Sequence, residues 1–141
     1  QLFEAALDKD GIAYKEYAIA DTNEVQSVTT AAAGECDVLY IPTDNTLASV
    51  TETVYNVVAP AKVPVIAGEE GICNGCGVAT LSISYYDLGY ATGEMAYEIL
   101  AEDADITTMD VRYAPNVTKK YNAKICEELG ITVPDDYVAI Q

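Results

Sequence analysis

The spacing of apolar residues changes between a helical and a strand period several times along the chain, and short turn segments separate the changes. Apolar residues three, four or seven positions apart predict helices, which lie at 1–10, 21–34, 45–59, 88–100 and 116–130. Short apolar runs without that spacing predict strands, which lie at 14–19, 37–42, 64–67, 79–83 and 111–113. A glycine-punctuated loop is predicted at 68–78. Since strands alternate with helices, we expect an α/β fold in which a parallel sheet is flanked by helices.

The composition and net charge of the chain limit the kinds of molecule that it can bind. The chain has 141 residues and 50% of them are hydrophobic, which is enough for a packed core in one domain. It carries 23 acidic and 7 basic residues, a formal net charge of −16. Such a surface repels phosphate backbones and anionic lipids, so we predict no nucleic-acid partner and no direct binding to a membrane surface. No run of residues reaches the roughly 20 apolar positions that a membrane-spanning helix needs.

The beginning of the chain predicts a larger protein. The first predicted helix has no strand before it, whereas a doubly wound unit normally opens with a strand. We therefore expect an export signal or membrane anchor, if there is one, to lie outside this chain. We also expect the isolated chain to self-associate, because a strand missing from its sheet would leave an open edge.

Four cysteines and the absence of histidine limit the available chemistry. Cys73 and Cys76 form a C-x-x-C pair, but a predicted strand follows Cys76, whereas redox dithiols of this spacing sit at a helix N-terminus. A zinc site needs four ligands, and without histidine only Cys36 and Cys126 remain to complete it. The sequence favours a local disulfide or free thiols over a metal site, and a metal site over a catalytic dithiol. We predict no cofactor, no metal and no catalytic residue.

Ligands of open α/β sheets bind beyond the carboxyl ends of the strands, and three such ends carry polar residues. After the predicted strands come Pro-Thr-Asp-Asn, Gly-Glu-Glu-Gly and Ser-Tyr-Tyr-Asp. Short polar side chains can bind a small polar molecule there, and a tyrosine can stack on it. Helix capping by Asp44 or Asn45 and by Asp87 is the competing interpretation. The candidate ligand-binding residues are Thr43, Asp44, Asn45, Glu69, Ser84, Tyr85 and Tyr86.

A glycine pair follows the tyrosines. Gly89 and Gly93 are four residues apart in the predicted helix at 88–100. Charged residues nearby exclude a membrane helix, so we expect the pair to let this helix approach the sheet closely.

Four stretches carry a resemblance to a known family. They are 37–45, which ends Pro-Thr-Asp-Asn; 62–69, Lys-Val-Pro-Val-Ile-Ala-Gly-Glu; 85–89, Tyr-Tyr-Asp-Leu-Gly; and the ending at 122–134. In this order they resemble the substrate-binding proteins of ABC transporters, in the group that includes the tryptophan and tyrosine import receptors. The chain departs from the pattern at Ser84, where an acidic residue is expected, and at the C-x-x-C pair.

The resemblance implies a type I periplasmic-binding-protein fold with two lobes that close on a ligand in the cleft between them. It implies that this chain is the C-terminal half, with 1–79 and 114–141 in the C-terminal lobe and 80–113 crossing to the N-terminal lobe. Cleft residues of the family fall on Thr43, Asp44, Asn45 and Glu69, which the strand-end argument selects independently.

The resemblance also implies a non-enzymatic receptor, which binds an amino acid and delivers it to a membrane permease. Such receptors are periplasmic, or extracellular and held to the membrane by an N-terminal lipid. Two other functions remain open at this point. One is the effector-sensing domain of a transcription regulator, and the other is a thiol oxidoreductase on a flavodoxin-like scaffold.

Overall fold

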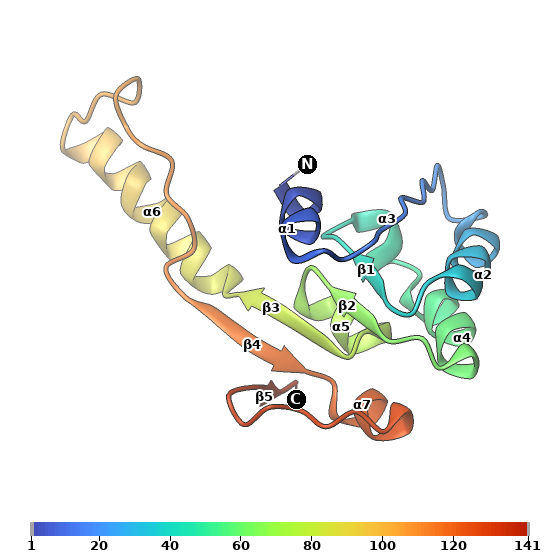
Figure 1. Ribbon diagram of the computed structural model, residues 1–141. Helices are drawn as coiled ribbons and strands as arrows, with labels where there is room; N and C mark the ends of the chain where they lie inside the picture. The colour runs from blue at the N-terminus through green and yellow to red at the C-terminus, as the bar shows by residue number, and fades with distance from the viewer. Residues whose placement is uncertain (1, 141) are drawn as a thin grey trace.

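The computed structural model, described here for residues 2–140, contains a five-stranded sheet (Figure 1). The strands lie side by side in chain order and are β1 (Leu39–Ile41), β2 (Val65–Ala67), β3 (Ala79–Ile83), β4 (Val117–Tyr121) and β5 (Val138–Ala139). Neighbouring strands are parallel except β3 and β4, which are antiparallel. The predicted α/β fold with a parallel sheet flanked by helices is therefore confirmed, apart from the antiparallel pairing of β3 with β4.

Seven helices connect these strands within the described residues. They are α1 (Leu2–Asp10), α2 (Val25–Glu35), α3 (Asn45–Ala48), α4 (Thr51–Ala61), α5 (Glu70–Cys76), α6 (Tyr85–Ala101) and α7 (Ala123–Leu129). The single helix predicted at 45–59 is two helices, because the backbone leaves the helical conformation at Val50. Pro60 lies inside α4, and Lys62 ends that helix in the left-handed conformation.

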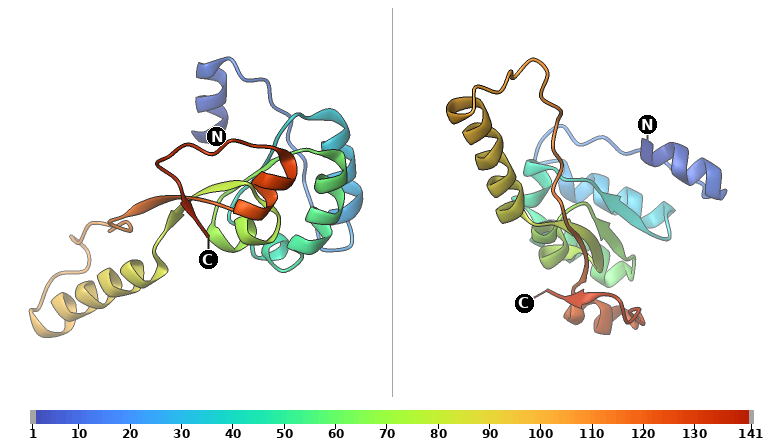
Figure 2. Two further views of the ribbon diagram at one scale, coloured as in Figure 1. Left: turned by 90° about the horizontal axis from the view of Figure 1, so that it is seen from below. Right: turned by 90° about the vertical axis from the view of Figure 1, so that its left-hand side faces the viewer.

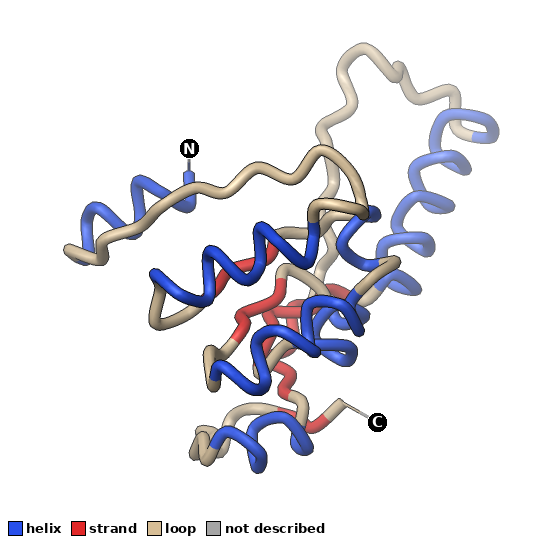
Figure 3. The backbone as a smooth tube through the Cα atoms, turned by 90° about the vertical axis from the view of Figure 1, so that its right-hand side faces the viewer, coloured by secondary structure: helices blue, strands red, loops and turns tan. Residues whose placement is uncertain are grey.

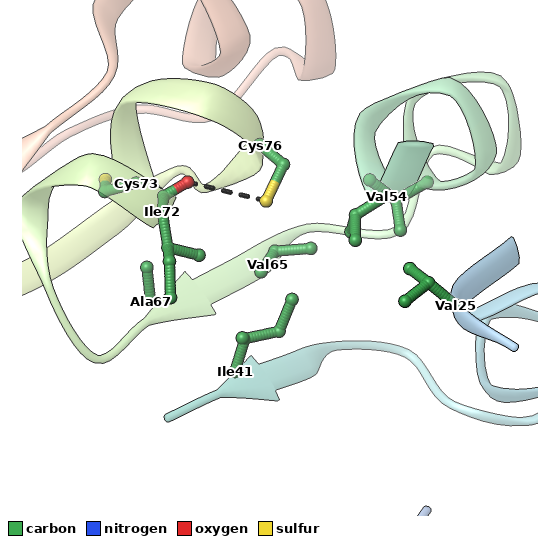
Figure 4. Packing of buried hydrophobic residues seen from close by; sticks show 9 residues of the cluster. Val25, Ile41, Val54, Val65, Ala67, Ile72, Cys73 and Cys76 are labelled. Carbon is green, nitrogen blue, oxygen red and sulfur yellow. Dashed lines mark hydrogen bonds between the residues drawn. The ribbon is translucent and has the colours of Figure 1, made fainter. Parts of the chain in front are cut away.

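The main core lies between the helices α2, α4 and α5 and one face of the sheet (Figure 4). Side chains of a strand alternate between faces, so Val65 and Ala67 point into this core while Ile66 is exposed. Each covering helix contributes a completely buried side chain to the cluster: Val25 from α2, Val54 from α4 and Ile72 from α5. On the other face of the sheet, Phe3 of α1 stacks on Tyr40 with 4.2 Å between ring centroids.

Two predicted strands are wrong. Residues 14–19 have no strand partner; Lys15 and Tyr17 instead bind Glu35 at the end of α2. Residues 111–113 also lie outside any strand. Both segments are rich in apolar and aromatic residues, but a strand also needs a neighbouring strand for its backbone hydrogen bonds.

The predicted loop at 68–78 is also wrong, and the predicted helix at 116–130 is correct only from Ala123 to its end at Gly130. The former contains α5, which packs so closely on α4 that a Cβ on Gly75 would lie 2.2 Å from the Thr51 Oγ1. The latter is strand β4, which pairs with all five residues of β3, followed by α7. Asn122 separates the two by accepting a hydrogen bond from the Ile125 N–H, as an N-cap does.

Helix α6 and the segment 102–116 project away from the rest of the molecule (Figures 1 and 2). We call residues 85–116 the arm, and residues 25–83 with 117–140 the body. None of the 17 residues of α6 is buried. A Cβ on Gly89 or Gly93 would meet nothing within 4 Å, so the expected close approach to the sheet is wrong. The tube view shows the same separation of α6 from the helices of the body (Figure 3).

Among the described residues, no helix combines the length and the apolar composition that crossing a membrane requires.

Candidate functional site

The carboxyl ends of β1 and β2 lie side by side and are hydrogen-bonded to each other. Gly68 donates its N–H to the carbonyl of Ile41 at 2.7 Å, and the Thr43 hydroxyl donates to the carbonyl of Gly68 at 3.3 Å. A Cβ on Gly68 would lie only 2.6 Å from the backbone nitrogen of Thr43. Glycine is therefore needed here, because any larger residue would push the two strand ends apart.

Three of the candidate residues are N-caps of the helices that follow these strands. Asp44 accepts from the Leu47 N–H at 2.8 Å and caps α3, and Ser84 accepts from the Asp87 N–H at 3.1 Å and caps α6. Glu69 accepts from the N–H groups of the second and third residues of α5. The cap bonds fix the orientation of each side chain at its strand end.

The capping interpretation is thus correct for Asp44 and wrong for the other two residues. Asn45 is the first residue of α3 rather than its cap. Asp87 lies in the first turn of α6, where its carboxylate accepts from the Asn116 side chain at 3.4 Å. Ser84 takes the cap position that the sequence assigned to Asp87.

The strand-end edge can bind a positively charged group. Asp44 is exposed and Glu69 is half-buried, and they follow adjacent parallel strands. Carboxylates held at neighbouring positions are suited to hydrogen-bond an ammonium. Thr43 and Asn45, both exposed, add a hydroxyl and an amide to the same edge.

The two tyrosines of the predicted site differ in their surroundings. Tyr85 and Tyr86 form the first turn of α6, where they are 60% and 80% exposed. Tyr85 borders a hollow of about 250 Å³ next to the strand ends, and Tyr86 is not among the residues that line it.

That hollow contains residues that the sequence did not identify. Lys120 of β4 donates to a carboxylate oxygen of Glu70 at 2.6 Å, and the Ser82 hydroxyl lies 3.4 Å from the same oxygen. Thr118 and Lys120 were not selected from the sequence because a helix was predicted at 116–130. Residues two apart share a face on a strand but not on a helix. The residues Val, Thr and Tyr in Val-Thr-Lys-Lys-Tyr, which favour strands, were the available signal.

A second hollow, of about 490 Å³, lies along α6. All of its lining residues belong to that helix or to Glu102 directly after it. Since no second element encloses a ligand there, the strand-end edge is the better candidate site.

A sequence model of the family described as "ABC transporter substrate binding protein" matches residues 1–140. This chain belongs to that family. The family is non-enzymatic, which agrees with the prediction that the chain is not an enzyme.

Individual relatives agree with the assignment to the substrate-binding proteins. A tyrosine-binding protein of Clostridioides difficile is 38% identical over 99 residues, which are 67% of this chain and 29% of that protein. The ligand-free, open structure of a Clostridium difficile substrate-binding protein with adhesive properties is 34% identical, with a TM-score of 0.75, over 99% of this chain and 48% of that one. The structure of a Streptococcus pneumoniae ABC domain in complex with L-Trp is 32% identical, with a TM-score of 0.84, over 95% of this chain and 45% of that one. The chain thus spans about a third to a half of the length of the relatives it matches.

The thiols of this substrate-binding chain do not form a redox site. All four cysteines are free, so the disulfide alternative is wrong and the free-thiol alternative is correct. Cys73 and Cys76 lie in α5 and are buried, and this desolvation raises the pKa of each thiol to about 12. A catalytic dithiol needs the opposite shift. Within residues 2–140 no group of three or more metal-ligating side chains gathers at one place.

Proposed function

We propose that this chain forms one wall of the ligand site of a solute receptor that captures an amino acid and delivers it to an ABC permease. The observation that carries the proposal is the meeting of Thr43, Asp44 and Glu69 at the joined ends of β1 and β2. Family membership supports a receptor role over the effector-sensing alternative. The names of two relatives, which refer to tyrosine and L-Trp, support an aromatic amino acid as the ligand.

The site chemistry matches an α-amino acid. The carboxylates of Asp44 and Glu69 would bind the ligand ammonium, a pairing that strengthens when a closing cleft excludes water. A tyrosine ring would cover the apolar part of the ligand, and polar contacts would complete the site. In this proposal the ligand-binding residues are Thr43, Asp44, Asn45, Glu69, Ser84, Tyr85 and Tyr86.

We propose further that the ligand lies between two lobes. Residues 1–79 and 114–141 would belong to one lobe, and 80–113 would cross to the other. The exposed apolar side chains of the arm support this, because a second lobe would cover them. They are Tyr85, Tyr86, Tyr90, Tyr97, Leu100, Ile106, Val111 and Tyr113.

A receptor of this kind works outside the cytoplasmic membrane. We propose that it is periplasmic, or extracellular and anchored by a lipid, with the ABC permease as its protein partner. The net charge of −16 supports the absence of nucleic acid from its partners.

Titration calorimetry of the protein, expressed from its own gene, against the twenty amino acids tests this proposal. We expect one or a few amino acids to bind, with tyrosine or tryptophan among them. Asp44→Asn keeps the cap acceptor but removes the charge, so it should weaken binding by about 2–4 kcal/mol. Asp135→Asn, at an exposed position in the segment after α7, is the control and should change nothing. Equal affinities in Asp44→Asn and the unchanged protein would contradict the role of Asp44.

A further inference from the structure

Four elements meet around the hollow of about 250 Å³ beside the strand ends. Glu70 begins α5, Ser82 lies on β3, and Ser84 and Tyr85 begin α6. Strand β4 contributes Thr118, opposite Ser82, and Lys120, two residues further on the same face. The lining residues thus combine the hydroxyls of two serines, one threonine and one tyrosine with one carboxylate and one ammonium.

The ion pair in this hollow is partly withdrawn from water. The side chains of Lys120 and Glu70 are 28% and 38% exposed, and Ser82 beneath them is only 5% exposed. A charge pair in such a position is less screened than one on the surface. The pair also places its ammonium at a fixed point, because Glu70 is held by its position at the start of α5.

The strand-end edge is negatively charged, so a ligand that carries a carboxylate can bind there only if a cation of the protein lies nearby. Asp44, Glu69 and Glu70 all lie at or next to the ends of β1 and β2, and like charges at short range repel. Of the residues that line the hollow, Lys120 is the one with a positive charge. An amino acid brings both an ammonium and a carboxylate, so an edge with carboxylates alone would attract one end of it and repel the other.

We propose that Lys120 binds the α-carboxylate of the ligand, with Glu70 as the residue that positions it. This inference rests on the proposed amino-acid-binding function. One N–H of the Lys120 ammonium is used by Glu70, and two remain for a ligand carboxylate. The hydroxyls of Ser84 and Thr118 border the same hollow and can donate to that carboxylate. Tyr85, at the rim, would lie against the ligand side chain.

The chain contains a matched control for this lysine. Lys119 is its neighbour on β4 and points to the opposite face, where it binds Asp136 and lies 5.6 Å from the ring centre of Tyr137. A substitution of either lysine removes one positive charge and one salt bridge from the same strand. Only Lys120 lines the hollow.

The test compares L-tyrosine with tyramine, which lacks the carboxylate, by calorimetry. We expect Lys120→Met to bind L-tyrosine at least tenfold more weakly than the unchanged protein does. It should bind tyramine equally well or better, because Glu70 is then left without its partner. Lys119→Met should retain both affinities, and Lys120→Arg should retain the preference for L-tyrosine over tyramine.

Four outcomes would overturn the inference. Unchanged affinity of Lys120→Met for L-tyrosine would show that the lysine does not bind the ligand. An affinity for both compounds that is reduced by the same factor would show that the lysine only supports β4. Loss of the preference in a folded Lys120→Arg would show that the positive charge is not what matters. If the unchanged protein binds none of the twenty amino acids, the proposed function itself is wrong and the inference falls with it.

Discussion

The body and the arm have similar sequence patterns and very different packing. Helix α4 of the body and helix α6 of the arm both carry apolar residues at helical spacing. In α4 those residues include Val54 and Val58, which are buried, whereas α6 has no buried residue. An amphipathic pattern therefore predicts that a helix forms, but it does not predict which surface covers the apolar face.

Glycines show the same contrast between the two regions. In the body, a Cβ on Gly68 or Gly75 would lie within 3 Å of a neighbouring segment. In the arm, a Cβ on Gly89 or Gly93 would meet open space. Gly68 and Gly75 therefore permit close packing, while Gly89 and Gly93 only cost helix stability.

The largest expected difference between the regions is in thiol reactivity. The pKa of Cys73 and of Cys76, raised to about 12 by burial in the body, leaves almost no thiolate at pH 8. A cysteine introduced into the arm by Leu100→Cys, at a position that is 83% exposed, should have an ordinary thiol pKa. We expect Cys73 and Cys76 to react with a thiol reagent more than about 100-fold more slowly than that cysteine. Equal rates would contradict the description of the body as a closed core.

The same pKa shifts predict how stability depends on pH. Because the folded-state pKa of Cys73 and Cys76 is raised, folding favours the protonated thiols. Their contribution is complete below the ordinary thiol pKa and is lost as the pH rises from about 9 towards 12. Denaturant unfolding between these pH values measures the loss, and Cys73→Ala/Cys76→Ala should have a flatter profile.

The next largest difference between the body and the arm should be in the stability lost when an apolar side chain is truncated. Ile72 is completely buried in the body, so Ile72→Ala should lower the free energy of unfolding by about 2–5 kcal/mol. Leu100 is 83% exposed in the arm, so Leu100→Ala in the isolated 141-residue chain should change the free energy of unfolding by less than about 0.5 kcal/mol. Urea denaturation of both variants measures the difference. A large loss in Leu100→Ala would mean that the arm has a partner in solution.

Adding a methyl group to glycine should have opposite signs in the two regions. Gly68→Ala should destabilise the protein by about 1–3 kcal/mol, because the Cβ would overlap the backbone at Thr43. Gly93→Ala should stabilise it by about 0.5–1 kcal/mol, because alanine is the better helix former and the space is open. Thermal unfolding followed by circular dichroism measures both shifts, and the same sign in the two variants would contradict this account.

The smallest effect concerns the cap of α3. Asp44→Ala removes the acceptor for the Leu47 N–H and should cost about 1 kcal/mol, whereas Asp44→Asn should keep the cap and cost little. Chemical denaturation without ligand measures this difference. Ligand binding should be weakened in both variants, because both lack the negative charge of Asp44. Equal stability of the two variants would show that the cap contributes nothing.

Much of the fold could be predicted from local patterns. The apolar runs that became β1, β2 and β3 and the helical spacing of α2, α4 and α6 were read correctly from the sequence. Strand β4 and helix α5 could not be identified in this way. Two lysines in β4 reduced its apolar signal, and its pairing with β3 joins residues far apart in the chain. Helix α5 contains two glycines, which lower its helix propensity, and it is held by packing against α4 and the sheet.

The candidate site was predictable only in part, because local patterns do not show which distant strands pair. The rule that ligands bind beyond parallel strand ends selected Thr43, Asp44 and Glu69, which the structure brings to adjoining ends. Lys120 was missed because it reaches the hollow through the antiparallel pairing of β4 with β3. Whether these residues bind a ligand stays a prediction.

Amide chemical shifts in the presence and absence of L-tyrosine test the central claim most directly, since they report on both regions of one protein. We predict that the largest changes fall at the strand-end edge, at Thr43, Glu69, Ser84 and their neighbours, while α7 and the far end of α4 stay unchanged. Changes confined to the α6 face between Tyr90 and Glu102 would contradict the account, because the ligand would then bind the arm and not the ends of the strands.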